Sequence, residues 1–494
     1  MPPAGQPAAG HRVGRGVKLL PPAELLGRLH GPWLLSTDGL RDVSARQKTL
    51  RGAIGWSYDL LSPVEQTLFR RLSVFAGGFT LQAAEMVCGE ENDEGDQGPT
   101  VLDGVALLLE RNLVQRETGL YGETRYAMLE TVREFGLESL AVSGEEDALR
   151  ARHASSFLQL VENANQMDPN PRRLLQNRLI DDEIHNMRAA HAWAIQHARQ
   201  TSLLITAYLA SWYRQRGPYA EAIHLIDKIL ALPGALDPTI ARARVLYEAG
   251  IIMLYKGEVV QARAMFEECL AISTYFGYDQ GKADALTLLG RMALWWLQDS
   301  AAANRYLENA LACYRELKSP SGVSWALFFL TKVALVRGDF VRAQKLGEEN
   351  LAIAQREGLG FTWPLNRLGE VSYANGDLGR ARSLFEESMA IERQSGDSHM
   401  SVETHLGLTL TTIRLKDFDT ARACLDRMLG HYEKLGNDRI PTFAAVTCTR
   451  RRWTGKKATT LAPSTGTAPV CQEYRSTEMN GVRGGWSGRP GFEV

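Results

Sequence analysis

The second half of this 494-residue chain repeats itself with a period of about 40 residues. In each repeat, a turn is followed by an alanine and then by apolar residues at helical spacing. Successive alanines are separated by 40, 41, 40, 38 and 40 residues, and they are Ala222, Ala262, Ala303, Ala343, Ala381 and Ala421. Because one such unit cannot bury its apolar face alone, consecutive units must stack on one another.

Each turn is preceded by a second helical stretch with a small residue where two helices must approach closely, as at Ala210, Gly250 and Gly369. The unit is therefore predicted to be a helix-turn-helix hairpin, and the stack a superhelix with a continuous core and a concave inner surface. The pattern resembles a long version of the tetratricopeptide repeat, recurring six times over residues 203–436. The predicted fold class is mostly α, with this α-solenoid following a smaller domain.

The concave surface of such an array is suited to binding a protein, a peptide, a small effector or a second copy of the chain. The candidate partner-binding residues lie on the first helices of the hairpins and are Arg214, Arg291, Trp295 and Arg367. The alternative is that aromatic residues near the turns only fill the hairpin core, and these residues are Tyr213, Tyr255, Trp296 and Tyr373.

A small helical domain with a two-stranded hairpin is predicted for residues 46–145. Its firmest element starts at Ser62, because Pro63 suits the first helical position and Glu65 completes a capping box with Ser62. Two further helical stretches follow, the second over residues 101–113, and then two strand-like runs joined by a glycine-containing turn at residues 120–123. Helices followed by such a hairpin indicate the winged-helix arrangement.

In a DNA-binding winged helix, the helix before the wing presents basic or amide side chains to base edges. Here that helix offers Asp103, Glu110 and the single Arg111, with leucines between them. Phosphates would repel this acidic surface, so DNA is not the partner that we expect. DNA reading stays as the alternative, and the wing residues Arg116 and Arg125 would favour it if they lay beside other basic side chains.

Three segments of this region resemble a bacterial family of signal-transducing ATPases with numerous domains. They are the run from TLRGAIGWSYDLL to AAEMVC, the LLERNLV segment and RYAMLETVREFGLESL, and DDEIHNMRAAHAWAI resembles the family's entry into its repeats. The resemblance covers most of residues 20–436. It implies a place between an upstream NTPase module and a downstream sensor array, often in transcriptional regulators of the LuxR or SARP kind.

In the wider group, the winged helix ends in a Met-His-Asp motif whose histidine touches the phosphate of a bound nucleotide. By resemblance this motif falls on Met128, Leu129 and Glu130. A leucine cannot donate a hydrogen bond to phosphate, so the resemblance implies a packing role here and no cofactor.

A phosphate-binding loop of the form GxxxxGK[ST] is missing from the sequence, and WTGKKATT does not fit it. Residues 1–45 are too few for a nucleotide-binding module, and PPAELLGRL resembles only the end of its helical lid. We therefore expect the C-terminal part of a larger switch protein, from a truncated or frameshifted gene or with its NTPase encoded separately. Such a chain should not hydrolyse ATP alone.

The organisation that follows has five parts. Residues 1–45 are a lid remnant and linker, 46–145 the winged helix, 146–202 a helical entry, 203–436 six repeats, and 437–494 a tail. The tail is basic, threonine-rich and without apolar periodicity, and disorder is predicted for it. Its RRR and KK clusters are a second route to nucleic acid, although a solvated tail is the better explanation of them.

Composition narrows the remaining function classes. The chain has 56 basic and 57 acidic residues, which gives no general field for nucleic acid or an anionic membrane. Its six cysteines form no CxxC pair, its histidines lack metal-ligand spacing, and HExxH and GxSxG motifs are missing. Neither a signal peptide nor a membrane helix is predicted.

The sequence therefore predicts a cytoplasmic, non-enzymatic regulator, with a winged helix coupled to a tetratricopeptide-like sensor scaffold. A peptide, effector or second protomer on the array would change how the array packs on the winged helix. In this chain that change would act on an NTPase subunit only in trans.

Overall fold

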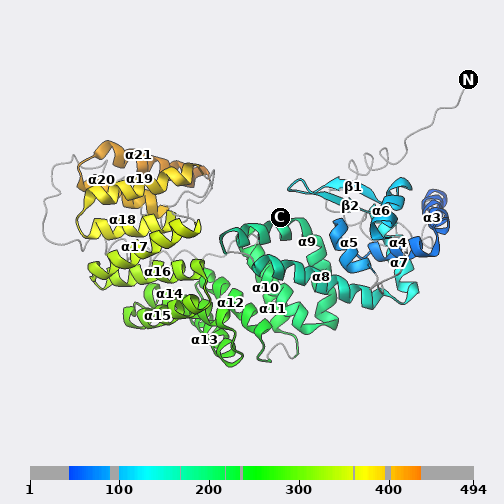
Figure 1. The fold of residues 1–494 in the computed structure, drawn as a ribbon, viewed down its shortest axis with the longest axis horizontal. Coiled ribbons are helices and arrows are strands. Elements are labelled where there is room, and N and C mark those ends of the chain that lie inside the picture. Colours follow the sequence, from blue (N-terminus) through cyan, green and yellow to red (C-terminus); the bar gives the residue numbers. More distant parts are fainter. Residues whose placement is uncertain are drawn as a thin grey trace, which may run out of the picture. The chain divides into compact units, whose positions relative to one another are not determined.

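The computed structural model describes residues 44–89, 100–166, 169–216, 219–233, 237–359, 362–394 and 402–434 (Figure 1). The expected lid remnant and the expected basic tail lie outside these residues. The chain divides into two compact units. Unit 1 contains residues up to 159 together with 181–194, and unit 2 contains 160–180 and the residues from 195 onward.

Unit 1 begins with α3 (Ser44–Asp59), α4 (Pro63–Leu72), α5 (Leu81–Cys88) and α6 (Val101–Glu110). Helix α4 starts as predicted: the Ser62 hydroxyl accepts from the backbone N–H of Glu65, and the Glu65 carboxylate accepts from the N–H of Ser62 at 2.7 Å. Two orphan donors of the first turn are thereby satisfied. Helix α6 starts with the same device, built from Thr100 and Asp103.

The wing is a hairpin of β1 (Gln115–Thr118) and β2 (Thr124–Ala127), antiparallel with Arg116 opposite Tyr126. Its turn places Gly122 at φ 91°, a left-handed conformation that glycine adopts without strain. On its other side, β2 exchanges backbone hydrogen bonds with Phe79 through Tyr126, at 2.7 and 2.8 Å. The wing is therefore tied to the loop before α5.

The remaining helices of unit 1 close its core. They are α7 (Glu130–Ser143), α8 (Glu146–Gln166), whose last residues belong to unit 2, and residues 181–194 of α9 (Pro169–His197). Phe69 of α4 is fully buried beside Phe135 of α7 and Tyr58 of α3. Burying a ring of this size stabilises the fold by about 2–3 kcal/mol.

In the described part of unit 2, six helical hairpins follow one another, with α10 (Arg199–Arg216) and α11 (Tyr219–Leu230) as the first. The following pairs are α12 (Ile240–Lys256) with α13 (Val259–Tyr275), α14 (Asp279–Trp295) with α15 (Ser300–Glu316), and α16 (Pro320–Val336) with α17 (Phe340–Glu357). The last pairs are α18 (Thr362–Ala374) with α19 (Leu378–Gln394), and α20 (Val402–Arg414) with α21 (Phe418–Lys434). The predicted mostly α fold, a winged helix followed by an α-solenoid, is confirmed.

The periodic alanines lie where the two helices of each hairpin meet, and all six are 0% exposed. The small residues opposite them are equally constrained. A β-carbon added to Gly250 would lie 2.5 Å from the Phe266 ring, and one added to Gly369 would lie 2.8 Å from the Phe385 ring. The period in the sequence is therefore a period in the close packing of helix pairs.

The turns also repeat. In four hairpins, an aspartate caps the second helix by accepting from backbone N–H groups of the first turn, and the caps are Asp299, Asp339, Asp377 and Asp417. The residue before each aspartate has a positive φ, and these residues are Gln298, Gly338, Gly376 and Lys416. A left-handed residue followed by an N-cap is thus the local rule that ends one helix and starts the next.

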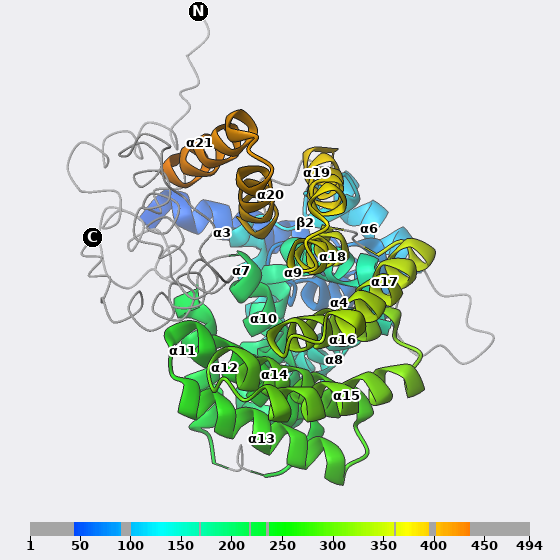
Figure 2. The ribbon, with the colours of Figure 1, turned by 90° about the vertical axis from the view of Figure 1, so that its left-hand side faces the viewer.

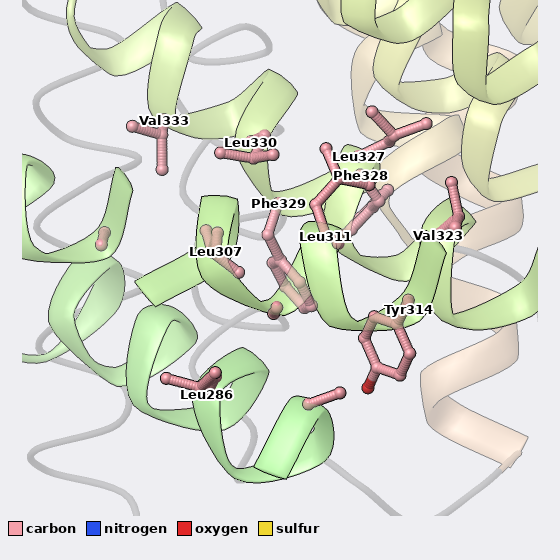
Figure 3. Packing of buried hydrophobic residues seen from close by; sticks show 14 of the residues in the cluster. Leu286, Leu307, Leu311, Tyr314, Val323, Leu327, Phe328, Phe329, Leu330 and Val333 are labelled. Atoms are coloured by element: carbon pink, nitrogen blue, oxygen red, sulfur yellow. The ribbon is translucent and has the colours of Figure 1, made fainter. Parts of the chain in front are cut away.

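The hairpins share one core along the stack. Leu286 of α14, Leu307 and Leu311 of α15, and Leu327 and Phe329 of α16 belong to one cluster of buried residues, all less than 6% exposed (Figure 3). Residues far from each other in sequence therefore complete each hairpin's apolar face, as stacking requires.

Candidate functional site

The first helices of the hairpins form one layer of unit 2. Figure 2 shows α12, α14, α16 and α18 following one another along the inner side of a curve, with α13, α15 and α17 along its outer side. The four candidate partner-binding residues are on this inner layer, one on α10, two on α14 and one on α18. Their environments differ sharply.

Arg214 of α10 pairs with Glu248 of α12, with 3.0 Å between Nε and a carboxylate oxygen. The two side chains are 14% and 10% exposed, so the pair is largely shielded from water. Burial opposes the charged form of Arg214, but Glu248 outweighs it and the pKa of Arg214 is raised. This arginine already has a carboxylate.

Arg291 of α14 has no such partner. Among the described residues it makes no hydrogen bond or ion pair, and its Nε is buried without an acceptor. The guanidinium carbon lies 5.5 Å from the ring centre of Trp295 and 5.8 Å from that of Trp296. Burial lowers the pKa of Arg291, and the positive charge of Arg214 lowers it further.

Trp295 is the first ring of an aromatic strip that crosses three inner helices, which we define as Trp295, Phe329, Trp325 and Trp363. Neighbouring ring centres along this strip are 5.5, 5.5 and 6.1 Å apart, and Trp325 stacks on Phe329 at an interplanar angle of 14°. Trp325 is 41% exposed and Trp363 48% exposed. Large exposed aromatic side chains that lie together mark an interaction surface more often than a core.

Arg367 of α18 is only 2% exposed, so it does not present a charge to the inner surface. Its guanidinium lies 4.1 Å from the ring centre of Phe328 and donates to Glu370 at 2.6 Å, and Glu370 also accepts from Lys332 at 3.0 Å. Although burial opposes it, the pKa of Glu370 is lowered by these two cations. Arg367 thus packs on Phe328, whose ring contacts three members of the aromatic strip.

The aromatic residues near the turns differ in burial. Tyr213 is 3% exposed and fills a hairpin core, whereas Tyr255 is 40% exposed. Trp296 and Tyr373 are half-buried. The sequence reasoning did not single out Trp325 and Trp363, although their separation of 38 residues, close to one repeat, was a signal for a shared face.

A cavity of about 320 Å³ lies near the start of the array, lined in part by Glu162, Gln200, Thr239 and Arg244. Arg244 donates to Glu162 at 3.1 Å and to the Tyr208 hydroxyl at 3.0 Å, and its pKa is raised mainly by Tyr278 and Tyr208 against the effect of burial. Its donors are therefore occupied, in contrast to those of Arg291.

In unit 1, the helix before the wing does not offer a basic surface. Glu110 of α6 is exposed, Leu102 is 50% exposed, and Asp103 caps its own helix. Arg111 donates to the backbone carbonyl of Leu60 at 3.1 Å. The exposed face of α6 is acidic and apolar, as the sequence indicated.

The two wing arginines differ. Arg116 is exposed and donates to the Thr124 hydroxyl at 3.2 Å. Arg125 is 6% exposed, and its guanidinium is bound by Glu183 of α9, with one contact of 3.0 Å. Burial opposes the charge of Arg125, but Glu183 raises its pKa overall. Arg125 is therefore not available to a phosphate.

The segment DDEIHN of α9 holds the wing at several points. Asn186 accepts from the backbone N–H of Ala76 at 2.7 Å and donates to the Gly78 carbonyl at 2.8 Å. Asp182 accepts from the backbone N–H of Leu120 at 3.0 Å, and Asp181 accepts from the Tyr121 hydroxyl at 2.7 Å. These side chains fix the hairpin and the loop before α5 to one helix.

The three residues at the expected nucleotide-sensing motif lie at the start of α7. Leu129 is the N-cap residue without a capping side chain and is 51% exposed, and Glu130 pairs with Arg133 of its own helix at 2.8 Å. Met128 is half-buried. Neither the Leu129 side chain nor the Glu130 carboxylate can donate a hydrogen bond to a phosphate.

Cysteines and metal-binding groups add no chemistry in the described residues. Cys88, Cys269, Cys313 and Cys424 are buried free thiols, and burial raises the pKa of Cys88 and Cys269 to about 12. Within the described ranges, no group of histidine, cysteine and carboxylate side chains is arranged to hold a metal. None of the described helices has the length and apolar character needed to cross a membrane.

Comparison with known proteins agrees with this architecture. Residues 61–141 match the model of a winged helix-turn-helix domain family. A proposed HTH-type transcriptional regulator of Mycobacterium tuberculosis is 38% identical over 228 residues, which are 46% of this chain and 25% of the relative. An uncharacterized protein of the same organism is 35% identical over 155 residues, 31% of this chain and 39% of that protein.

Among solved structures, a signal-transduction ATPase with numerous domains from Pyrococcus horikoshii, which has a tetratricopeptide repeat sensor, superposes with a TM-score of 0.52. The match covers 88% of this chain and 68% of that one at 14% identity, so it supports the fold alone. The chain is thus a winged-helix protein with a tetratricopeptide-like array. It spans about a quarter of the length of the regulator that it resembles.

Proposed function

We propose that this chain is a regulatory scaffold that binds a protein or peptide on the inner layer of its repeats. The aromatic strip carries this proposal, because Trp325 and Trp363 are each more than 40% exposed and Trp325 lies between Phe329 and Trp363. Exposed tryptophans in a cluster are typical of the central contacts of protein interfaces.

The winged helix is proposed to couple the array to a signalling output. Its relatives named as HTH-type regulators support a role in transcription. The sequence segments that resemble signal-transducing ATPases motivate the proposal of an NTPase partner acting in trans. On this proposal the chain itself catalyses no reaction and acts in the cytoplasm, either with that NTPase or with a second copy of itself. A LuxR-like or SARP-like output belongs to the same proposal.

DNA binding by the winged helix is the second candidate, favoured only by the family match at residues 61–141. The exposed acidic Glu110 and the buried Arg125 argue against it. Salt-dependent binding of a labelled random-sequence duplex, lost on charge reversal of Arg111 and Arg116, would establish it instead.

The first test is quantitative affinity capture from bacterial lysate with the full chain, with and without ATP. We expect a Trp325→Ala, Trp363→Ala double variant to lose at least about 90% of the specific partner, because truncating interface tryptophans typically costs 2 kcal/mol or more each. Tyr275→Ala, which removes an 82% exposed ring from the outer helix α13, is the matched control.

Capture that is equal for the double variant and the wild type would contradict binding at the strip. Recovery of a protein with a phosphate-binding loop, changed by ATP, would support action in trans. Recovery of a second copy of this chain would instead support self-association.

A further inference from the structure

Arg291 is a half-buried inner-layer arginine whose charge the described residues leave uncompensated. Its side chain is half-buried and its Nε is buried without an acceptor, yet it makes no ion pair. A guanidinium keeps its charge at any physiological pH, so it cannot relieve this situation by losing a proton. A shielded cation without an anion is unfavourable, and folds retain few of them.

Other arginines of the array show what such a residue ordinarily has. Six of them each form an ion pair with a carboxylate, and they are Arg214, Arg242, Arg315, Arg342, Arg380 and Arg382. Several of these partners lie about one repeat away along the chain, so the stacking of repeats normally supplies the acid. At Arg291 the stack supplies instead a second cation, Arg214, and two tyrosines, Tyr247 and Tyr255.

The local charge count leaves room for one anion. Arg214 and Arg291 contribute two positive charges, and Glu248 contributes one negative charge that Arg214 already uses. The contacts of Arg291 with Trp295 and Trp296 involve the π-faces of the rings, which attract a cation but accept no strong hydrogen bond. A guanidinium in this setting keeps N–H donors for an acceptor in its plane, the geometry that suits a carboxylate.

The surface next to this cation is aromatic. Trp295 contacts the Arg291 guanidinium and also begins the aromatic strip, so the cation and the strip meet at one residue. From there the strip continues through Phe329 and Trp325 to Trp363, across three inner helices. An occupant must therefore combine one anionic group with apolar side chains beside it.

We propose that Arg291 is a carboxylate-binding point, and that the strip takes a partner peptide in which a carboxylate is followed by aromatic or aliphatic side chains. This inference rests on the proposed function and names the chemistry of its partner. The carboxylate is an aspartate or glutamate side chain or a free C-terminus, because both present the same acceptor.

A peptide fits this surface better than single-stranded nucleic acid does. Bases also stack on tryptophans, but nucleic-acid binding uses a continuous positive groove along the backbone. Here Glu370 pairs with both Lys332 and Arg367, and it cancels part of the positive charge of these two residues. The single guanidinium of Arg291 matches one carboxylate.

The test starts with selection of binders to the full chain from a phage library of random linear dodecapeptides, counter-selected on the Trp325→Ala, Trp363→Ala variant. We expect the enriched peptides to share an aspartate or glutamate next to aromatic or aliphatic residues. The best peptide is then synthesised with a fluorescein label and titrated by anisotropy. In a second version of the peptide, asparagine or glutamine replaces the acidic residue. A third version keeps this replacement and has a free C-terminal carboxylate as its only carboxylate.

Arg291→Leu should weaken the acidic peptide about 10- to 100-fold, since a charge-assisted hydrogen bond contributes about 1.5–3 kcal/mol. The amide version should bind wild type and Arg291→Leu equally, which isolates the pairing of the two groups. Arg263→Leu, which removes a half-exposed arginine from the outer helix α13, should leave the affinity unchanged.

Stability gives a second readout. Because Arg291 makes no ion pair, Arg291→Leu should not lower the melting temperature of the free chain, whereas a structural arginine would lower it by several degrees. A large decrease would overturn the assignment of Arg291 as a binding point.

Other outcomes separate the two proposals. If the enriched peptides lack a carboxylate, or bind the wild type and Arg291→Leu with equal affinity, Arg291 does not bind a carboxylate. The proposal that the strip binds a peptide is unaffected by that result. A selection without enrichment overturns this inference, while protein capture by the strip still tests the proposed function by itself. If a labelled dodecathymidylate binds in an Arg291-dependent way and peptides do not, the partner of the strip is a single-stranded nucleic acid and the peptide proposal is wrong.

Discussion

Arg125 shows how one residue can remove a function that a fold otherwise permits. In a wing it would be placed to meet a DNA phosphate, but here it is 6% exposed and bound to Glu183. The two residues are 58 positions apart in sequence, and no periodicity connects them. The sequence could therefore name Arg125 as a candidate but could not show that its charge is already used.

The buried pair predicts a specific defect. Arg125→Ala leaves the Glu183 carboxylate buried without its cation, and breaking such a pair costs about 3–5 kcal/mol. Hydrogen–deuterium exchange of residues 115–127 in the full chain should become faster, because the wing loses its strongest attachment to α9.

The control for this prediction is Arg116→Ala, since Arg116 is exposed and its side chain donates to Thr124 within its own hairpin. Arg116→Ala should lower the free energy of unfolding by less than about 1 kcal/mol. Unchanged exchange in Arg125→Ala would mean that the backbone contacts to Phe79 hold the wing without the ion pair.

His153 provides a pH-dependent prediction. Burial lowers the pKa of this histidine to about 4, and its Nε2 lies 3.5 Å from the Asn186 amide oxygen. In the unfolded chain the pKa of a histidine is about 6.5, so the unfolded state binds the proton first as the pH falls. The stabilisation is complete above about pH 6.5 and is lost as the pH falls toward 4.

The loss attributable to His153 is about 3 kcal/mol at most over this range. Urea denaturation of wild type and His153→Gln across the range measures it, because the variant lacks the titrating ring. The two stabilities should converge as the pH is lowered. Parallel stability curves for His153→Gln and the wild type would refute the assignment.

At the scale of elements, the turns between paired helices obey one rule with different residues. Gly376 and Lys416 hold equivalent places, with φ of 82° and 62°, each followed by a capping aspartate. Residues with a β-carbon are strained there by about 1 kcal/mol or more. The array tolerates lysine because the cap and the flanking helices determine the turn.

Because the two positions are equivalent, exchanging their residues should change the free energy of unfolding by different amounts. Gly376→Lys should lower the free energy of unfolding by about 1 kcal/mol, since the left-handed conformation strains a side chain even where space is open. Lys416→Gly should change it by less, because relief of strain is offset by the greater freedom of glycine in the unfolded chain. Thermal melting of both variants checks the order, and equal losses would contradict it.

Elements were predicted from sequence where a local or periodic rule determined them. The capping box at Ser62 and Glu65 needs only residues three apart, and the alanines mark each hairpin because only a small residue fits between paired helices. The side-chain environment of Arg291 needed the structure. Whether a carboxylate reaches it depends on how helices from three repeats meet, and the sequence contains abundant carboxylates on every helix.

At the scale of the molecule, the two units provide different surfaces. Unit 1 uses its charged wing residue Arg125 internally and exposes an acidic, apolar α6, whereas unit 2 exposes aromatic rings beside a cation. On the proposed function, recognition belongs to the array and coupling to the winged helix. The composition of the helix before the wing led to the same proposal from sequence, but the sequence analysis did not locate Trp325 and Trp363.

The aromatic strip also gives the molecule a built-in optical probe. Three of the ten tryptophans lie in it, and Trp296 is 6.1 Å from Trp295, so these indoles exchange excitation energy and interact as coupled chromophores. An occupant that covers the strip changes their solvent exposure together and shifts their emission to shorter wavelengths. The unlabelled chain thus reports its own occupancy, and a spectrum recorded during purification reveals whether a ligand has been carried along.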